Sequence, residues 1–309
     1  MPSARAAALL QGLLVTALWS SSWVLIKIGL HDLQLGPFSF AGLRYGLAAA
    51  VLLPFALRRL EQACGWWRDA RLVGGVVGLG VLFYAATQGA QFVALGLLPA
   101  AALSLLLSST PLFVALLGLA APRERPSALQ VVGVALLAAG ALVYFGVADL
   151  GHAGPAGLTV GLLGALTNAA SAVLGRRLSR QAEVRLGGVV PLTALSMAVG
   201  AVLLLAAGLI LEGPPHLGAR SWLVVAWLAL VNTAFAFTLW NHTLRTLTAL
   251  ESSVLNGTML VQIAALAWLF LGEALTVAEI AGLTLASTGV LLVQLRSIGR
   301  STSPRSASS

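Results

Sequence analysis

Several polar side chains lie inside long apolar stretches of this sequence, and their types limit the chemistry that they could perform. Within residues 72–93, Tyr84, Gln88 and Gln91 follow at intervals of four and three, which places them on one helix face. The candidate binding residues in this and other stretches are Trp19, Tyr84, Gln88, Ser108, Asn168, Asn232, Trp240 and Asn256. Indole, hydroxyl and carboxamide groups carry no charge and act through hydrogen bonds and ring contacts. The set therefore predicts a site for a neutral or zwitterionic solute.

Each of these residues also has a structural interpretation. Serine and threonine hydroxyls in membrane helices more often bond to a nearby carbonyl or pack between helices. Trp19 and Tyr84 would, on this view, face lipid or fill a core. For Gln88, Asn168, Asn232 and Asn256 both interpretations stay open. A carboxamide cannot satisfy all its donors locally, so it seeks a partner helix, water or a ligand.

Two cations, Lys27 and Arg44, lie within the apolar stretches 7–30 and 38–57. Lys27 is close enough to a helix end for its side chain to reach the surface. Arg44 is deeper, about two helical turns after Pro37. Either residue could attract an anionic group that enters from outside, or it could anchor helix-end carbonyls or Asp32. We slightly favour the structural anchor for Arg44.

The sequence contains no recognisable catalytic or cofactor-binding motif. A phosphate-binding loop requires a glycine-rich segment followed by Lys and Ser or Thr, but the single lysine, Lys27, has no such context. The four histidines fall near expected helix ends without metal-ligand spacing. No catalytic triad or carboxylate pair can be placed at membrane depth. We expect no metal, no cofactor and no enzymatic activity.

The composition indicates that a bilayer surrounds most of the chain. Hydrophobic types make up 59% of the 309 residues and charged types only 9%, whereas a soluble domain carries roughly 25% charged residues. About 20 apolar residues in a helix span a bilayer core. The candidate spans are 7–30, 38–57, 72–93, 98–120, 128–147, 157–175, 189–211, 222–243, 252–271 and 277–295. The sequence predicts an all-α membrane protein with ten transmembrane helices.

The arginines predict how these helices are oriented. With a cytoplasmic N-terminus, the expected outer connections contain only Arg220, and the other connecting arginines lie inside. This asymmetry follows the positive-inside rule and predicts a bacterial inner-membrane protein with both termini cytoplasmic. The arginines form short clusters rather than one basic stripe, so the net charge of +8 does not indicate nucleic-acid binding.

The two halves of the chain resemble each other at an offset of 149 residues. The aligned pairs are Lys27 with Arg176, Glu124 with Glu273, Gly133 with Gly282, and Gly140 with Gly289. Each half would contain five helices, and an odd number inverts the second copy in the membrane. We therefore expect inverted five-helix repeats over 7–147 and 155–296, followed by a disordered cytoplasmic tail over 297–309.

Motifs in both halves match a known family. The first expected helix carries Trp19, Ser20, Trp23 and Lys27, and the second carries Pro37, Phe40, Arg44 and Tyr45. Each half also contains a segment that ends in a glutamate, Pro111 to Arg123–Glu124 and Leu260 to Gly272–Glu273. The chain resembles the EamA family of the drug/metabolite transporter superfamily. It departs where Arg123 replaces the usual glycine and Leu260 the usual proline.

This resemblance implies a ten-helix carrier with cytoplasmic termini and a central cavity. Combined with the uncharged candidate residues, it predicts secondary or facilitative export of small metabolites by alternating access. Neutral, hydrophobic or aromatic amino acids are the best candidates. An intramembrane lipid-modifying enzyme or a channel-like component is the alternative. The expected partners are a small-molecule substrate and the lipid bilayer, without nucleic acid, for a monomer or weak homodimer.

Overall fold

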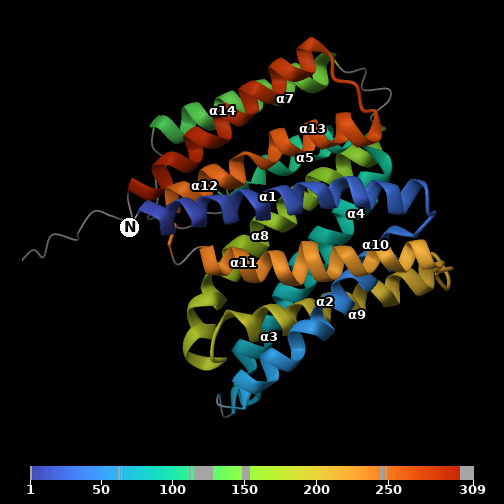
Figure 1. Cartoon of the computed structure of the whole chain (residues 1–309), viewed down its shortest axis with the longest axis vertical. Coiled ribbons are helices and arrows are strands. Elements are labelled where there is room, and N and C mark those ends of the chain that lie inside the picture. The colour runs from blue at the N-terminus through green and yellow to red at the C-terminus, as the bar shows by residue number, and fades with distance from the viewer. Residues whose placement is uncertain are drawn as a thin grey trace, which may run out of the picture.

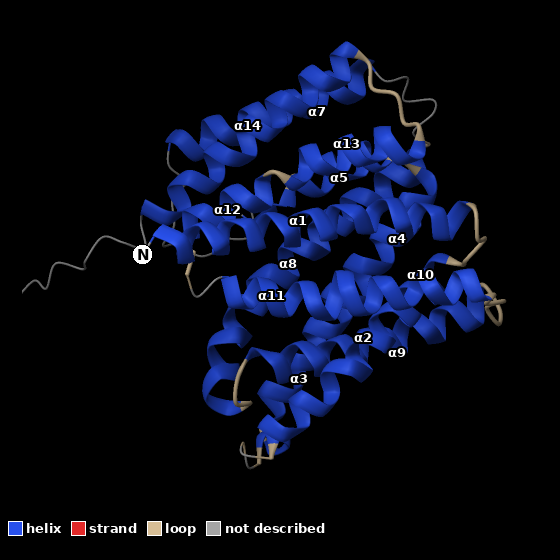
Figure 2. Cartoon of the chain, viewed as in Figure 1, coloured by secondary structure: helices blue, strands red, loops and turns tan. Residues whose placement is uncertain are grey.

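The computed structural model shows a helical chain. It describes residues 2–61, 63, 65–110, 113–114, 128–147, 154–243, 246–247 and 249–299. Within these residues, helices are joined by short loops and no strand occurs (Figure 2). The motif from Pro111 to Glu124 that contributed to the family resemblance lies almost entirely outside the described residues.

The helices follow one another along the chain as shown in Figure 1. In the first half they are α1 (Pro2–His31), α2 (Pro37–Leu60), η1 (Trp66–Arg68), α3 (Ala70–Leu79), η2 (Gly80–Thr87), α4 (Gln88–Leu97), α5 (Ala100–Ser108) and α7 (Ala128–Val147). In the second half they are α8 (Pro155–Arg185), α9 (Val189–Leu211), α10 (Ala219–Ala229), η3 (Leu230–Phe235), α11 (Ala236–Thr243), α12 (Ala249–Gly257), α13 (Met259–Leu271) and α14 (Val277–Gly299).

Seven helices within the described residues are long and apolar enough to cross a membrane. Two shorter apolar helices cover 131–144 and 277–292. The total of ten stays a prediction, because the expected span 98–120 is described only to Thr110 and at 113–114. The first three residues assigned to a disordered tail belong to α14, and 300–309 lie outside the described residues.

Glycines allow α7 and α14 to pack with their backbones in contact. A Cβ atom on Gly140 would lie 2.6 Å from the carbonyl oxygen of Gly282, and one on Gly289 would lie 2.5 Å from that of Gly133. Gly289 and Gly282 lie 149 residues after Gly140 and Gly133, respectively. The two contacts are therefore the same contact with the repeats exchanged, which is the reciprocity that a two-fold axis produces.

The start of α2, the helix that carries Arg44, is held by a carboxylate from the end of α9. Pro37 opens the helix, and the preceding residue, Gly36, provides no capping side chain. Glu212 accepts hydrogen bonds from the backbone nitrogens of Phe38 at 2.7 Å and Ser39 at 2.9 Å. The first amides of a helix lack internal partners and attract negative charge. Glu212 thus fixes α2 against α9, along which it packs.

Polar contacts join helix ends at opposite sides of the molecule. At one side, Arg185 pairs with Asp69, and Arg59 donates to the carbonyl oxygen of Gly187 at 3.3 Å. At the other side, Glu212 caps α2. Figure 1 shows the α1–α2 and α9–α10 connections at the right, and the α8–α9 connection at the lower left. Each contact joins connections that the arginine distribution assigns to the same side of the membrane.

Candidate functional site

A cavity of about 610 Å³ lies between the two halves of the chain. Residues from α1, α2, η2, α4, α5, α8, α11, α12, α13 and α14 line it. Six of the eight residues proposed from the sequence are among them, namely Trp19, Tyr84, Gln88, Ser108, Asn168 and Asn256. The residues that line the cavity therefore come from segments that are far apart in the sequence.

Two π-helical segments shape the helices beside this cavity. η2 interrupts the helix from Ala70 to Leu97, and η3 interrupts the helix from Ala219 to Thr243. η3 lies within the stretch that corresponds to η2 at the 149-residue offset. A π-helical turn contains an additional residue, so it rotates the side chains beyond it and often occurs at functional sites.

Tyr45 connects α2 to the wall formed by η2 and α4. Its hydroxyl donates to the Oε1 atom of Gln88 at 2.7 Å. Its ring also meets that of Tyr84 edge-on, with centroids 5.4 Å apart. The Nε2 donors of Gln88 have no hydrogen-bond partner within the described residues, and Gln88 lines the cavity. Tyr45 was not selected as a binding residue from the sequence, although it follows Arg44 in the quoted motif.

The serines of α5 follow their structural interpretation. Ser108 donates to the carbonyl oxygen of Ser104 at 2.8 Å, and Ser104 donates to that of Ala101 at 2.8 Å. Asn168 instead reaches another helix and donates to the Oγ1 atom of Thr110 at 3.2 Å. Both Ser108 and Asn168 line the cavity. Of these two, only Asn168 links two walls through its side chain.

An aromatic cluster forms the wall near α1 and α11. The ring centroid of Trp19 lies 5.3 Å from that of Phe237 and 5.4 Å from that of Trp240. Trp19 and Phe237 line the cavity, whereas Trp240 supports Trp19 and is not a lining residue. Phe83 also lines the cavity; the sequence offered no signal for it, since it is one apolar residue within an apolar stretch.

Asn232 lies outside the cavity lining and connects two helices. It is fully buried, and its Nδ2 atom donates to the carbonyl oxygen of Leu18 and to Ser21 Oγ. The Oδ1 atom of Asn232 and the Nε1 atom of Trp19 are buried without hydrogen-bond partners among the described residues. These contacts hold η3 against α1. They match the structural interpretation, in which a carboxamide seeks a partner helix.

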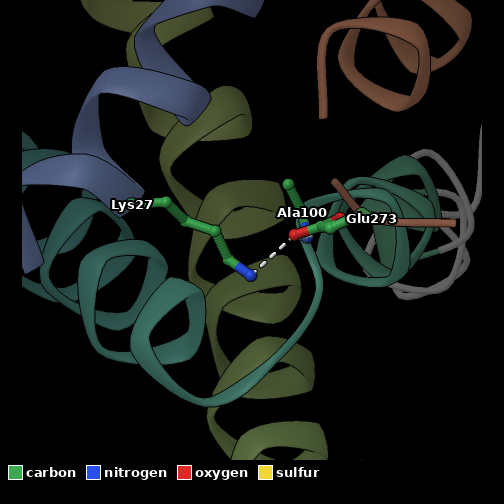
Figure 3. Close-up of polar contacts among 3 residues, drawn as sticks. All are labelled: Lys27, Ala100 and Glu273. Atoms are coloured by element: carbon green, nitrogen blue, oxygen red, sulfur yellow. Dashed lines mark hydrogen bonds and ion pairs between the residues drawn. The ribbon is translucent and has the colours of Figure 1, made fainter. Parts of the chain in front are cut away.

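The two cations have different surroundings. Lys27 forms an ion pair with Glu273, with Nζ and Oε1 2.7 Å apart, as Figure 3 shows. Glu273 also accepts from the backbone nitrogen of Ala100, the first residue of α5. Arg44 lines the cavity, and its Nε donates to Thr233 Oγ1 at 3.1 Å. Lys27 is not a lining residue.

The described residues contain no group of three His, Cys, Asp or Glu side chains that could hold a metal ion. The architecture is that of a multi-pass helical membrane protein with a central cavity lined by uncharged polar and aromatic residues and by Arg44. A model of the EamA-like transporter family matches the chain over residues 6–146 and again over 155–295. The chain belongs to this family of membrane transporters.

Similar proteins extend over nearly the whole chain. An uncharacterized transporter of Bacillus subtilis, YoaV, is 26% identical over 290 residues, which cover 90% of this chain and 93% of YoaV. A protein of Salmonella typhimurium named "Probable amino-acid metabolite efflux pump" is 27% identical over 294 residues, 91% of this chain and 92% of that protein. A solved crystal structure with 24% identity superposes with a TM-score of 0.63, covering 96% of this chain and 99% of the other, and shows the same fold.

Proposed function

We propose that this protein is a secondary or facilitative transporter that exports neutral, hydrophobic or aromatic amino acids across the inner membrane. The observation that carries the proposal is the chemistry of the cavity. Its described lining combines aromatic rings with hydroxyl and carboxamide groups, and Arg44 is its one charged residue. The volume of about 610 Å³ lies within the range of small-molecule sites.

The cargo class follows from the groups that the lining can stabilise. Trp19, Phe83 and Phe237 offer rings against which an apolar side chain packs. Gln88 and Asn168 offer carboxamide groups to the polar backbone of an amino acid. A carrier for organic cations usually needs a carboxylate to offset their charge at membrane depth, and the described lining contains none. The name of the Salmonella relative supports the same class of cargo.

The proposed mechanism is alternating access between inverted repeats, with both termini in the cytoplasm. The two matches to the family model and the reciprocal glycine contacts between α7 and α14 support equivalent halves around a central cavity. In this orientation, the contact among Lys27, Glu273 and Ala100 lies on the outer side. It joins α1, α5 and the end of α13, so we infer that it helps to close this side.

The test is transport by the purified full-length protein in proteoliposomes. Vesicles preloaded with unlabelled leucine, phenylalanine or tryptophan would be diluted into the same amino acid carrying a radioactive label. We expect saturable uptake that is accelerated by the internal substrate, which distinguishes a carrier from a channel-like pore. Empty liposomes are the control. If no neutral amino acid exchanges across protein-containing vesicles, the proposed cargo is wrong.

A further inference from the structure

Arg44 is a buried cation without a carboxylate partner in the described part of the chain. The residue is only 5% exposed. It lies seven residues after Pro37, about 10 Å along α2 at 1.5 Å per residue. The ion pairs of Lys27 with Glu273 and of Arg185 with Asp69 do not involve it. No carboxylate within this part of the structure therefore compensates its positive charge.

The surroundings of Arg44 hold one edge of the guanidinium and leave the other edge available. The Nε atom donates to the Oγ1 atom of Thr233, which itself donates to the carbonyl oxygen of Leu228 at 2.8 Å. The guanidinium carbon lies 5.1 Å from the centroid of the Tyr45 ring. The two terminal nitrogens have no hydrogen-bond partner among the described residues.

Thr233 fixes the orientation of the Arg44 guanidinium group through the hydrogen bond from Nε. Thr233 belongs to η3, where its hydroxyl reaches the carbonyl oxygen five residues earlier. The same pattern occurs in η2, where Thr87 donates to the carbonyl oxygen of Leu82 at 2.8 Å. A hydroxyl bonded to its own backbone presents a lone pair in a fixed direction. Thr233 thus positions Nε, and the free nitrogens belong to a residue that lines the cavity.

An unpaired cation at this depth in a membrane protein is energetically unfavourable and commonly marks a functional site. A tyrosine ring supplies partial compensation through its π-electrons. An anion that enters the cavity would provide the missing charge. The planar guanidinium group matches a carboxylate, because two parallel N–H donors meet its two oxygens. Lys27, the other cation left open by the sequence, is already satisfied by Glu273.

We propose that Arg44 binds the carboxylate of the transported substrate and so makes this carrier selective for carboxylates. This inference rests on the proposed function. A carboxylate on Arg44 would orient an amino acid within the cavity, with its apolar side chain toward rings such as Trp19 and Phe237. Arg44 would then reject amides and amines of the same shape, because they leave its charge unpaired.

The experiment measures binding of matched probes to purified full-length protein in detergent by isothermal titration calorimetry. The probes are phenylalanine, leucine and tryptophan, each with its carboxamide analogue, and 3-phenylpropionate with 3-phenylpropionamide. We expect the wild-type protein to bind at least one carboxylate more tightly than its amide by about tenfold or more. Arg44→Met should remove this preference. Arg44→Lys should retain part of it, because lysine keeps the charge but lacks the planar fork.

Arg220→Met is the matched control, since it removes an exposed cation that does not line the cavity, and it should keep the wild-type preference for carboxylates. Melting curves would show that each variant is folded. The proposal is overturned if folded Arg44→Met keeps the wild-type preference, or if no carboxylate probe binds the wild-type protein. Binding that depends on Arg44 without amino-acid exchange in proteoliposomes would reject the proposed cargo and support the Arg44 site.

Discussion

The Nζ atom of Lys27 lies 2.7 Å from the Oε1 atom of Glu273, across 246 residues of sequence. Both side chains are about 15% exposed or less. Glu273 also accepts from the backbone nitrogen of Ala100, with both oxygens at 2.9–3.0 Å. The carboxylate therefore satisfies a lysine of α1 and the first amide of α5 together. Removal of either partner leaves a poorly solvated charge.

Neutralisation of this ion pair should lower thermal stability. We expect Lys27→Met to cost about 1–3 kcal/mol, because Glu273 loses its cationic partner. Glu273→Gln should cost less than Glu273→Leu, since a glutamine oxygen still accepts from Ala100. The charge-swapped pair Lys27→Glu with Glu273→Lys should remain destabilised, because lysine cannot accept that hydrogen bond. Melting of the purified variants in detergent measures these effects. Full rescue by the charge swap would show that the contact with Ala100 contributes nothing.

The α7–α14 contact predicts that one glycine is sensitive to substitution and another is not. A Cβ atom on Gly282 would lie 2.7 Å from the carbonyl oxygen of Gly140 and 2.8 Å from the backbone nitrogen of Tyr144. Gly282→Ala should destabilise the protein by about 1–3 kcal/mol through overpacking. Gly74→Ala is the matched control, because nothing in the described chain lies within 4 Å of the position that its methyl group would occupy. Detergent melting curves should separate the two variants. Equal melting temperatures would refute the close packing.

Asn168 and Asn232 should respond to the same substitution in different ways. Asn168→Ala removes a carboxamide from the cavity wall, so we expect weaker substrate affinity with little change in stability. Asn232→Ala breaks the contacts of η3 with Leu18 and Ser21, which should cost about 1–3 kcal/mol. Counterflow kinetics and melting curves on the same preparations distinguish these effects. An unchanged transport affinity in Asn168→Ala would remove this residue from the proposed site.

Much of the fold is readable from the sequence because the bilayer constrains it. Apolar stretches of sufficient length must form helices whose backbone groups are satisfied internally. The repeat could also be recognised in the sequence, because the aligned residues Gly140 and Gly289 are positions where no side chain fits. The partner of Lys27 could not be predicted from the sequence. Glu273 lies on a distant helix end, and a charge pair between distant helices leaves no spacing pattern along the chain.

The sequence could predict part of the cavity lining but not all of it. The spacing of Tyr84 and Gln88 predicted a shared face, and both line the cavity. Asn232 lies in η3 and Trp240 comes after it, and neither lines the cavity. Asn232 instead donates to the carbonyl oxygen of Leu18 and to Ser21 Oγ, and the sequence contains no spacing signal that reveals such a contact between distant helices. Binding by the lining residues remains a prediction for transport measurements.

The orientation of the chain predicts where reporter proteins will fold. Fusion after Gly187, in the turn between α8 and α9, should place the reporter in the cytoplasm. Fusion after Gly213, which lies beyond the end of α9, should place it outside. The physical reason is the excess of arginines in the connections assigned to the inside. Green fluorescent protein reports the cytoplasmic side and alkaline phosphatase the outer side. The reverse pair of signals would contradict the orientation and place the Lys27–Glu273 contact on the inner side.

The lining of the cavity also predicts how transport depends on a proton gradient and on cargo charge. A carboxylate-based proton relay needs an Asp or Glu at membrane depth, and none is found in the described lining. We therefore expect neutral amino acids to move downhill in proteoliposomes at equal pH on both sides. An imposed pH gradient should change the rate little. Permanently charged cations should be poor substrates, because Arg44 repels them and no carboxylate in the described lining attracts them. The control is the same flux with a protonophore. Strict dependence on the gradient, or preference for a quaternary ammonium compound over every neutral amino acid, would contradict this prediction.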